Sequence, residues 1–202
     1  MTSASLGLWA ALGAAACWAS AAVLFKQTTE SVSPLGLTLV KGLVALVPFG
    51  ILVALNPVSL PLQSVAVLAL SGVIGIAVGD TLFFASLGAL PAHLVVVLVV
   101  LGQSLTVAGG VVLFGDDPSA GQWAGMALIL AGLFAALQEP PAGQPWGRGL
   151  LFGLGAVLAM TVGTLVAKAG LHEVPALPAT FVRLAAGTVG VALLGLARGQ
   201  IG

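Results

Sequence analysis

A single acidic residue, Asp80, stands inside a long apolar stretch of the sequence and is the first candidate for chemistry. A charged side chain in low-dielectric surroundings is costly unless it faces water, a partner or a cavity. Asp80 is therefore expected either to titrate protons or bind a substrate amine, or to be a structural acid paired with Lys41 or Arg183. Phe84 follows Asp80 by one helical turn and would lie on the same side of a helix.

Other polar or bulky side chains within apolar runs are further candidates. Gln103 and Ser104 fall midway along the next run, where they would either hydrogen-bond a neighbouring helix or line a cavity. Trp18 lies deep in the first run and would either line a cavity or pack in the core. Lys41 and Arg183 each stand about two turns inside a run, where they would line a solute path, pair with Asp80 or extend to the membrane surface. The predicted pathway residues are thus Asp80, Gln103, Trp18, Lys41, Arg183, Phe84 and Ser104.

Charged residues at the ends of apolar runs are predicted to be structural. Lys26 and Lys168 would complement carbonyl groups at helix ends. Asp116 and Asp117 would be solvated capping residues in a tight turn. No chemistry is expected from this group.

Composition excludes several classes of protein. The chain has 202 residues, of which 59% are hydrophobic and only 6% charged, whereas soluble domains have about one quarter charged residues. Six basic residues balance six acidic ones, so there is no basic face and no nucleic-acid partner is expected. The single cysteine, Cys17, excludes an internal disulfide and a multi-cysteine metal site. No catalytic motif occurs, so no enzyme, metal or cofactor is expected, and the predicted partner is the lipid bilayer.

Seven apolar segments are long enough, within a few residues, to cross a membrane core of about 30 Å. They run approximately over residues 6–25, 34–55, 61–90, 91–115, 119–137, 149–167 and 177–197. The segments are continuous rather than alternating, which favours helices over strands. An all-α, multi-pass membrane protein is therefore predicted, and glycines spaced four apart, such as Gly75 and Gly79, would let its helices approach closely.

The sequence also repeats itself weakly. A shift of 142 positions places Lys26 on Lys168 and Lys41 on Arg183. Five segments, an odd number, precede the second copy, so that copy would enter the membrane from the opposite side, as in the inverted repeats of many transporters. The predicted organisation is a five-helix repeat over residues 1–138, a linker over 139–148, and the first two helices of a second repeat over 149–202.

Three stretches carry a resemblance to a known family: residues 17–42, 79–117 and 122–133. Together they resemble EamA-type members of the drug/metabolite transporter superfamily. The resemblance implies ten helices in two inverted repeats, a cytoplasmic N-terminus and a cell-membrane location. The sequence departs from the family in lacking a proline near Gln103 and in having Asp116 where a glutamate is frequent. Helices eight to ten are also expected to be missing.

The resemblance and the repeat predict a transporter that moves a small organic solute by alternating access. Proton coupling through Asp80 is a secondary expectation. The alternative is a truncated, transport-inactive chain, or one that completes its helix bundle with a second copy or another polypeptide and has a structural or interaction role.

Overall fold

The computed structural model describes residues 3–136, 146–171 and 174–199, and every regular element in these ranges is helical. The elements are α1 (Ser3–Thr28), α2 (Pro34–Leu55), α3 (Leu62–Gly72), η1 (Val73–Asp80), α4 (Thr81–Ala89), α5 (Ala92–Phe114), α6 (Ala120–Ala136), α7 (Trp146–Gly170) and α8 (Ala176–Ala197). The segments α3, η1 and α4 follow one another without a break and form one span, Leu62–Ala89. The described residues therefore contain seven apolar helices, and the predicted fold class is confirmed.

Six of these helices are long and apolar enough to cross a membrane, and α6 is a shorter apolar helix. The predicted segments and the observed helices agree except at their ends. One difference concerns the predicted linker, because α7 already begins at Trp146. The rest of the linker, residues 139–145, lies outside the described residues.

Local sequence explains where several helices begin and end. Ser33 caps α2 by accepting a hydrogen bond from the backbone N–H of Gly36 at 3.1 Å, and Pro34 occupies the first helical position, where no N–H is needed. At the end of α5, Gly115 adopts the left-handed conformation with φ of 69°, which a residue without Cβ reaches without strain.

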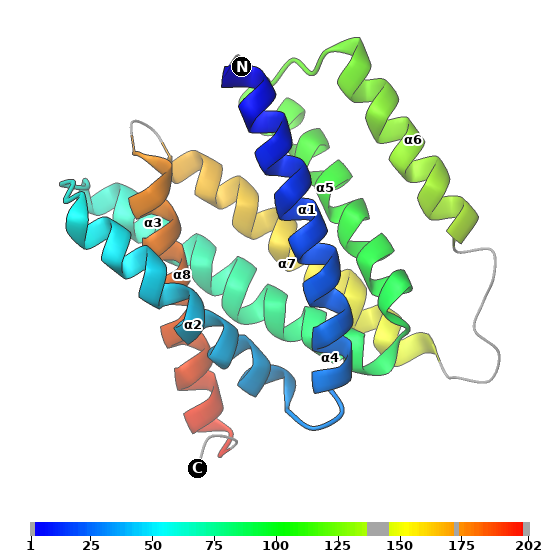
Figure 1. Cartoon of the computed structure of the whole chain (residues 1–202), viewed down its shortest axis with the longest axis horizontal. Helices are drawn as coiled ribbons and strands as arrows, with labels where there is room; N and C mark the ends of the chain where they lie inside the picture. The colour runs from blue at the N-terminus through cyan, green and yellow to red at the C-terminus, as the bar shows by residue number, and fades with distance from the viewer. Residues whose placement is uncertain (1–2, 137–145, 172–173, 200–202) are drawn as a thin grey trace.

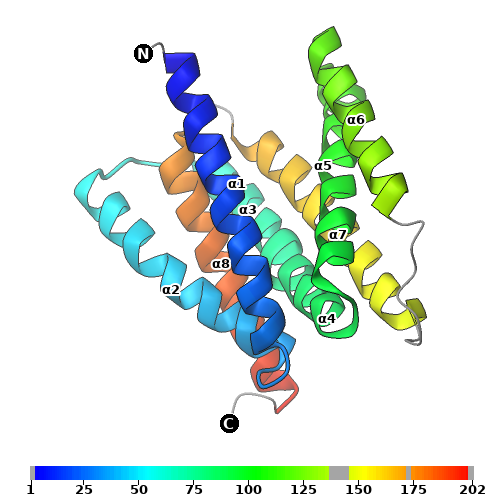
Figure 2. The same ribbon diagram turned by 45° about the vertical axis from the view of Figure 1, so that its right-hand side comes forward.

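The helix α7 lies in the middle of the bundle, where it packs against α3, η1, α4 and α5. The helix α8 packs against α2, α3 and η1, whereas α6 packs against α5 at one edge of the bundle (Figures 1 and 2). The first helix, α1, packs against α4 and α5. Figure 1 also shows that α1 and α7 run in opposite directions, since the N-terminus of α1 and the end of α7 lie towards the same side.

Close helix packing depends on glycine at the crossing of η1 and α7. A Cβ atom added to Gly163 would lie 2.6 Å from the Cα atom of Gly75, and one added to Gly79 would lie 2.9 Å from Cγ of Met160. Two of the predicted small residues, Gly75 and Gly79, therefore face a neighbouring helix. Gly125, from another pair spaced four apart, has open space beside it instead.

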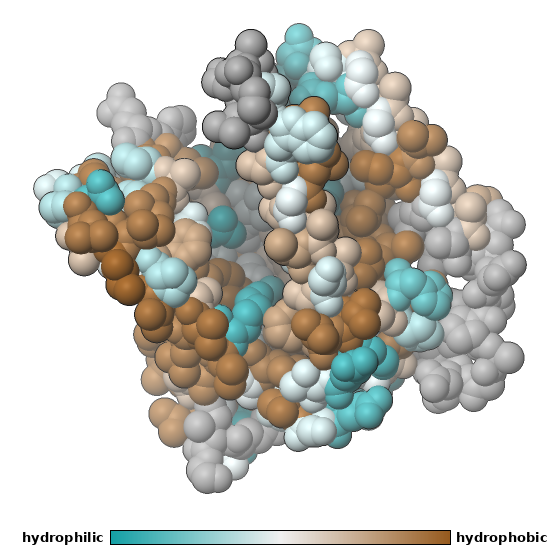
Figure 3. All heavy atoms as spheres, viewed as in Figure 1, coloured by the Kyte–Doolittle hydropathy of each residue, from teal (hydrophilic) through white to brown (hydrophobic). Residues whose placement is uncertain are grey.

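Much of the surface is apolar. Exposed side chains include Val112 at 81%, Leu128 at 76% and Leu62 at 84% of their full accessible area. Figure 3 shows hydrophobic residues across much of one face, over α2 and α6, with hydrophilic atoms at the helix ends and inside the hollow between α1 and α2. An apolar surface of this extent is compatible with contact with lipid rather than water.

Candidate functional site

A π-helix, η1, ends at Asp80. In a π-helix each backbone N–H bonds to the carbonyl group five residues back. Such helices are rare, and short examples are frequent at functional sites. Asp80 is buried, with 8% of its area exposed. Its Cα lies nine residues before the end of the span at Ala89 (89 − 80 = 9), which is about 14 Å at 1.5 Å per residue. Asp80 therefore lies well inside the span, in the second half of its 28 residues.

Asp80 is paired with a lysine from another helix. Nζ of Lys41, on α2, donates a hydrogen bond to Oδ2 of Asp80. The side chain of Lys41 is 35% exposed, against 11% for Asp80, and its Nζ lies 5.8 Å from the centre of the Phe84 ring. Of the two partners that the sequence left open for Asp80, Lys41 is therefore the one that forms the hydrogen-bonded ion pair.

Arg183 also faces Asp80, but it makes no such bond. It lies on α8, is half-buried, and is close enough for its charge to act on the carboxylate. Its Nε atom is buried without a hydrogen-bond partner among the described residues. The two basic residues that share a position in the sequence repeat thus approach the same acid from α2 and α8.

A cavity of about 80 Å³ lies beside the ion pair. Its lining residues come from five helical elements: Trp18, Ala22, Phe25, Lys41, Asp80, Phe83, Phe84 and Met160. This volume corresponds to two or three water molecules at about 30 Å³ each, whereas pockets for small organic ligands measure about 300–1,000 Å³. The cavity therefore accepts a small polar group in this conformation, but not a whole metabolite.

Four of the eight residues that line the cavity are aromatic: Trp18, Phe25, Phe83 and Phe84. The ring centres of Phe25 and Phe84 are 5.0 Å apart in an edge-to-face arrangement, and those of Trp18 and Phe83 are 6.0 Å apart. Trp18 remains 42% exposed, so the cavity is not fully enclosed. The cavity therefore combines one ion pair with a largely apolar wall.

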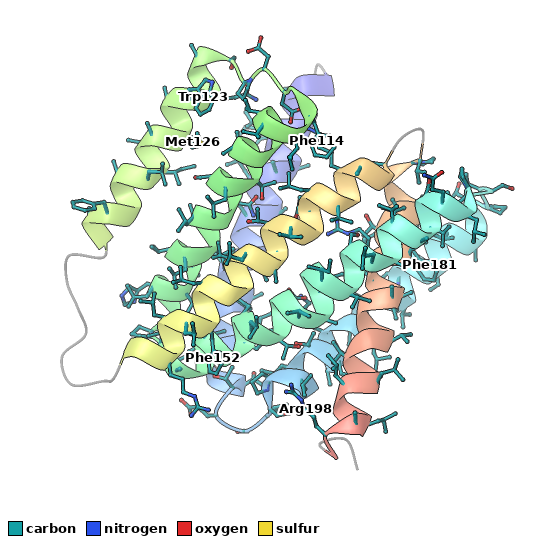
Figure 4. The ribbon with its side chains drawn as sticks, turned by 180° about the vertical axis from the view of Figure 1, so that it is seen from behind. Phe114, Trp123, Met126, Phe152, Phe181 and Arg198 are labelled. Carbon is teal, nitrogen blue, oxygen red and sulfur yellow. The ribbon has the colours of Figure 1, made fainter. Side chains whose placement is uncertain are left out.

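The other two predicted residues, Gln103 and Ser104, lie elsewhere. Both line a cavity of about 480 Å³ between α5 and α6, together with Asp117 and Met126. Figure 4 shows α6 beside α5, with Trp123 and Met126 on α6 and Phe114 near the end of α5. This cavity is larger than the first, but none of its lining residues belongs to the ion pair. The structure therefore divides the predicted residues into four that line the first cavity, two that line the second, and Arg183, which lines neither.

Four residues that line the first cavity were not among the predicted residues: Ala22, Phe25, Phe83 and Met160. Ala22 and Phe25 follow the predicted Trp18 at spacings of four and three positions, so a single helical face could have identified both. Met160 comes from α7, more than 70 positions after Phe84 (160 − 84 = 76), and no sequence pattern connects the two. Its place in the cavity follows from the packing of α7 against η1 and α4.

Two charged residues at helix ends have specific partners. Nζ of Lys26 donates to the carbonyl oxygens of Leu87 at 2.7 Å and Leu90 at 3.1 Å, so it binds the end of α4 rather than the end of its own helix. Asp116 is exposed, as predicted, but it pairs with Lys168 of α7 instead of being solvated alone. Both contacts join helices and explain why these charges are tolerated.

The model of the EamA-like transporter family matches residues 5–138, which is 134 of the 202 residues. The chain belongs to this family. No curated protein and no solved structure matches it. The protein is thus a membrane protein of a transporter family, of the drug/metabolite type, and not of a family of enzymes. The matched region contains Trp18, Lys41, Asp80 and Phe84, whereas Arg183 lies beyond it.

Proposed function

We propose that the protein moves a small organic solute across the membrane by alternating access, with the Lys41–Asp80 pair in the solute path. The observation that supports this most strongly is the position of the pair, well inside an apolar span and beside a cavity with aromatic walls. Charge pairs buried in a protein contribute little net stability, because desolvation offsets their attraction. A role in transport accounts for their presence at this depth.

The alternation involves two inverted repeats, residues 1–138 and 149–202, joined through residues 139–148. The register of Lys41 with Arg183 and the opposite directions of α1 and α7 support this division. Solute sites in such transporters lie near the middle of the membrane, where the repeats meet. The packing of α2 against α8 brings the second helix of each repeat together there.

The described conformation is the one in which the site is too small for solute. Movement of α1 away from η1 and α4 enlarges the cavity, because α1 supplies Trp18, Ala22 and Phe25 to its wall. Direct packing of α1 against α2 is at most slight in the described residues, so it does not oppose this movement. Figure 3 shows a hollow between these two helices.

Proton coupling through Asp80 forms part of the proposal. A proton on the carboxylate removes its charge and ends the attraction that joins α2 to η1. The charged groups that face Asp80 from the neighbouring elements are Lys41 on α2 and Arg183 on α8. Protonation therefore weakens the contact between α2 and η1, which borders the cavity that movement of α1 enlarges.

The proposal is tested by reconstituting the full chain into liposomes with a pH gradient. The vesicles receive a mixture of amino acids, sugars, amines and carboxylic acids, and their contents are measured by mass spectrometry. We expect at least one solute to accumulate with the gradient. Asp80→Asn should abolish accumulation but retain exchange of solute down its own gradient, whereas Glu30→Gln, an exposed acid in the loop after α1, should behave as the native chain.

Unchanged gradient-driven accumulation in Asp80→Asn would exclude the proton role. Absence of flux for every solute would instead favour the alternative of a transport-inactive chain with a structural role. Flux that rises with covalent linkage of two copies would favour a bundle completed by a second chain. The location in the cell membrane and the cytoplasmic N-terminus remain predictions.

A further inference from the structure

The charges around the cavity do not balance. Lys41, Asp80 and Arg183 contribute two positive charges and one negative charge, and the described parts of α2, α3, η1, α4 and α8 hold no other charged residue. On α7, Lys168 is already paired with Asp116 and Arg148 is exposed. On α1, Lys26 donates hydrogen bonds to the carbonyl oxygens of Leu87 and Leu90 at the end of α4. One positive charge therefore lacks a counter-charge at a depth where an isolated charge is strongly disfavoured.

Arg183 is the cation whose bonding is incomplete. Its buried Nε has no partner among the described residues, whereas Lys41 already donates to Asp80. The guanidinium group carries five N–H donors in a planar arrangement that fits a carboxylate or a phosphate with two parallel hydrogen bonds. The guanidinium lies near Gly75, five positions before Asp80 on η1, since a Cβ atom added to Gly75 would lie 3.8 Å from Nη2 of Arg183.

We infer that the transported solute is a monoanion whose carboxylate binds between Lys41 and Arg183, an inference that depends on the proposed function for the same site. A single negative charge brings the cluster to two positive and two negative charges. A phosphate monoester carries about 1.5 to 2 negative charges at neutral pH and would leave an excess of the opposite sign.

The shape of the site agrees with this assignment. The 80 Å³ cavity accepts about the volume of a carboxylate. Lys41 lines this cavity and Arg183 does not, so bonds from one carboxylate to both cations require the cavity to widen towards α8. The side chains of Lys41 and Trp18 are partly exposed, so the site is not sealed. The aromatic rings of Trp18, Phe25, Phe83 and Phe84 provide an apolar wall for the rest of the solute. The solute class is therefore a small carboxylic acid with an apolar body.

The test uses matched acids and amides, which differ in charge but hardly in shape. The probes are benzoate against benzamide and hexanoate against hexanamide, with phenyl phosphate as the dianion. Binding to the purified full chain in lipid nanodiscs is measured by the change in melting temperature and by titration calorimetry. We expect at least one of the carboxylates to bind and to raise the melting temperature, while neither amide does.

Substitutions identify the residue responsible. Arg183→Gln should weaken carboxylate binding at least tenfold, and Arg183→Lys, which keeps the charge, should weaken it less. Arg198→Gln, the same substitution at an exposed position just after α8, should leave binding unchanged. The melting temperature of each variant without probe reports whether it is folded, and Arg183→Lys provides the comparison if Arg183→Gln is unfolded.

The inference is wrong if the amides bind as tightly as the acids, if phenyl phosphate binds more tightly, if Arg183→Gln binds normally, or if no probe binds. These outcomes are separate from failure of the proposed function. Accumulation of only neutral or cationic solutes in the liposomes would retain the transporter and refute the anion site. Carboxylate binding that depends on Arg183, without flux of any solute, would retain the site and refute transport.

Discussion

The arrangement of charges around Asp80 predicts that the protein loses more stability when Asp80 is replaced than when its partner Lys41 is replaced. In Asp80→Asn, both Lys41 and Arg183 lose their counter-charge. In Lys41→Met, Asp80 keeps the charge of Arg183 nearby. The acid variant should therefore be the less stable of the two.

The expected magnitudes follow from burial and bonding. Removing one member of a buried charge pair costs about 3–5 kcal/mol when the other is left uncompensated. Loss of a hydrogen bond to a charged group costs about 1.5–3 kcal/mol. The loss of stability in Asp80→Asn should be about 3–5 kcal/mol, because no other acid among the described residues is near Arg183 to balance its charge. The loss of stability in Lys41→Met should be about 1.5–3 kcal/mol, because Asp80 retains the charge of Arg183 and the Lys41 side chain is already 35% exposed.

The free energy of unfolding is measured in mixed detergent and dodecyl sulfate micelles, with helix content followed by circular dichroism. Glu30→Gln, an exposed acid, controls for a general effect of removing a carboxylate. The double variant Lys41→Met/Arg183→Gln leaves Asp80 without either cation and should be at least as unstable as Asp80→Asn. The reasoning is refuted if Lys41→Met proves equal to or less stable than Asp80→Asn.

Three further predictions concern packing, helix ends and topology. Gly163→Ala should lower the free energy of unfolding by about 1–3 kcal/mol, as overpacking does, because the added Cβ would meet the backbone of Gly75. Gly125→Ala is the control, since Gly125 has open space beside it. Equal stability of the two variants would contradict the packing argument. Lys26→Met should speed hydrogen exchange near the end of α4, because the carbonyls of Leu87 and Leu90 lose their donor, and unchanged exchange there would show that this contact is dispensable. Arg148 is exposed, and if the N-terminus is cytoplasmic this position lies outside the cell. The cysteine of Arg148→Cys should then react with a thiol reagent that cannot cross the membrane, added to intact cells. Labelling only after lysis would reverse the predicted orientation.

The sequence alone was sufficient for the class of protein and the positions of its helices. Continuous apolar runs between prolines, glycines and charged residues are local features, and their lengths correspond directly to the thickness of a membrane. The family could also be identified, because its motifs are read along the chain, and the match over residues 5–138 confirms it. The predicted pairing of Asp80 with a basic residue was likewise within reach, since an acid buried in apolar surroundings requires a partner.

Other features depend on how distant helices meet. The choice of Lys41 over Arg183 as the hydrogen-bonded partner of Asp80 reflects the relative positions of α2, η1 and α8. Gln103 and Ser104 resemble pathway residues in the sequence, yet they line the separate cavity between α5 and α6. The π-helix before Asp80 has no signature that separates it from an ordinary apolar helix, because it differs only in hydrogen bonding.

Apolar length and local capping determine each helix separately, so the sequence determined the helices and the need of Asp80 for a partner. The site combines side chains from α1, α2, η1, α4 and α7, with Arg183 added from α8. Its composition depends on close contacts such as that between Gly75 and Gly163, which set the rotation and depth of each helix. Only the tertiary structure decided which of the buried charges and aromatic rings meet, because those distances arise from packing between segments far apart in the chain.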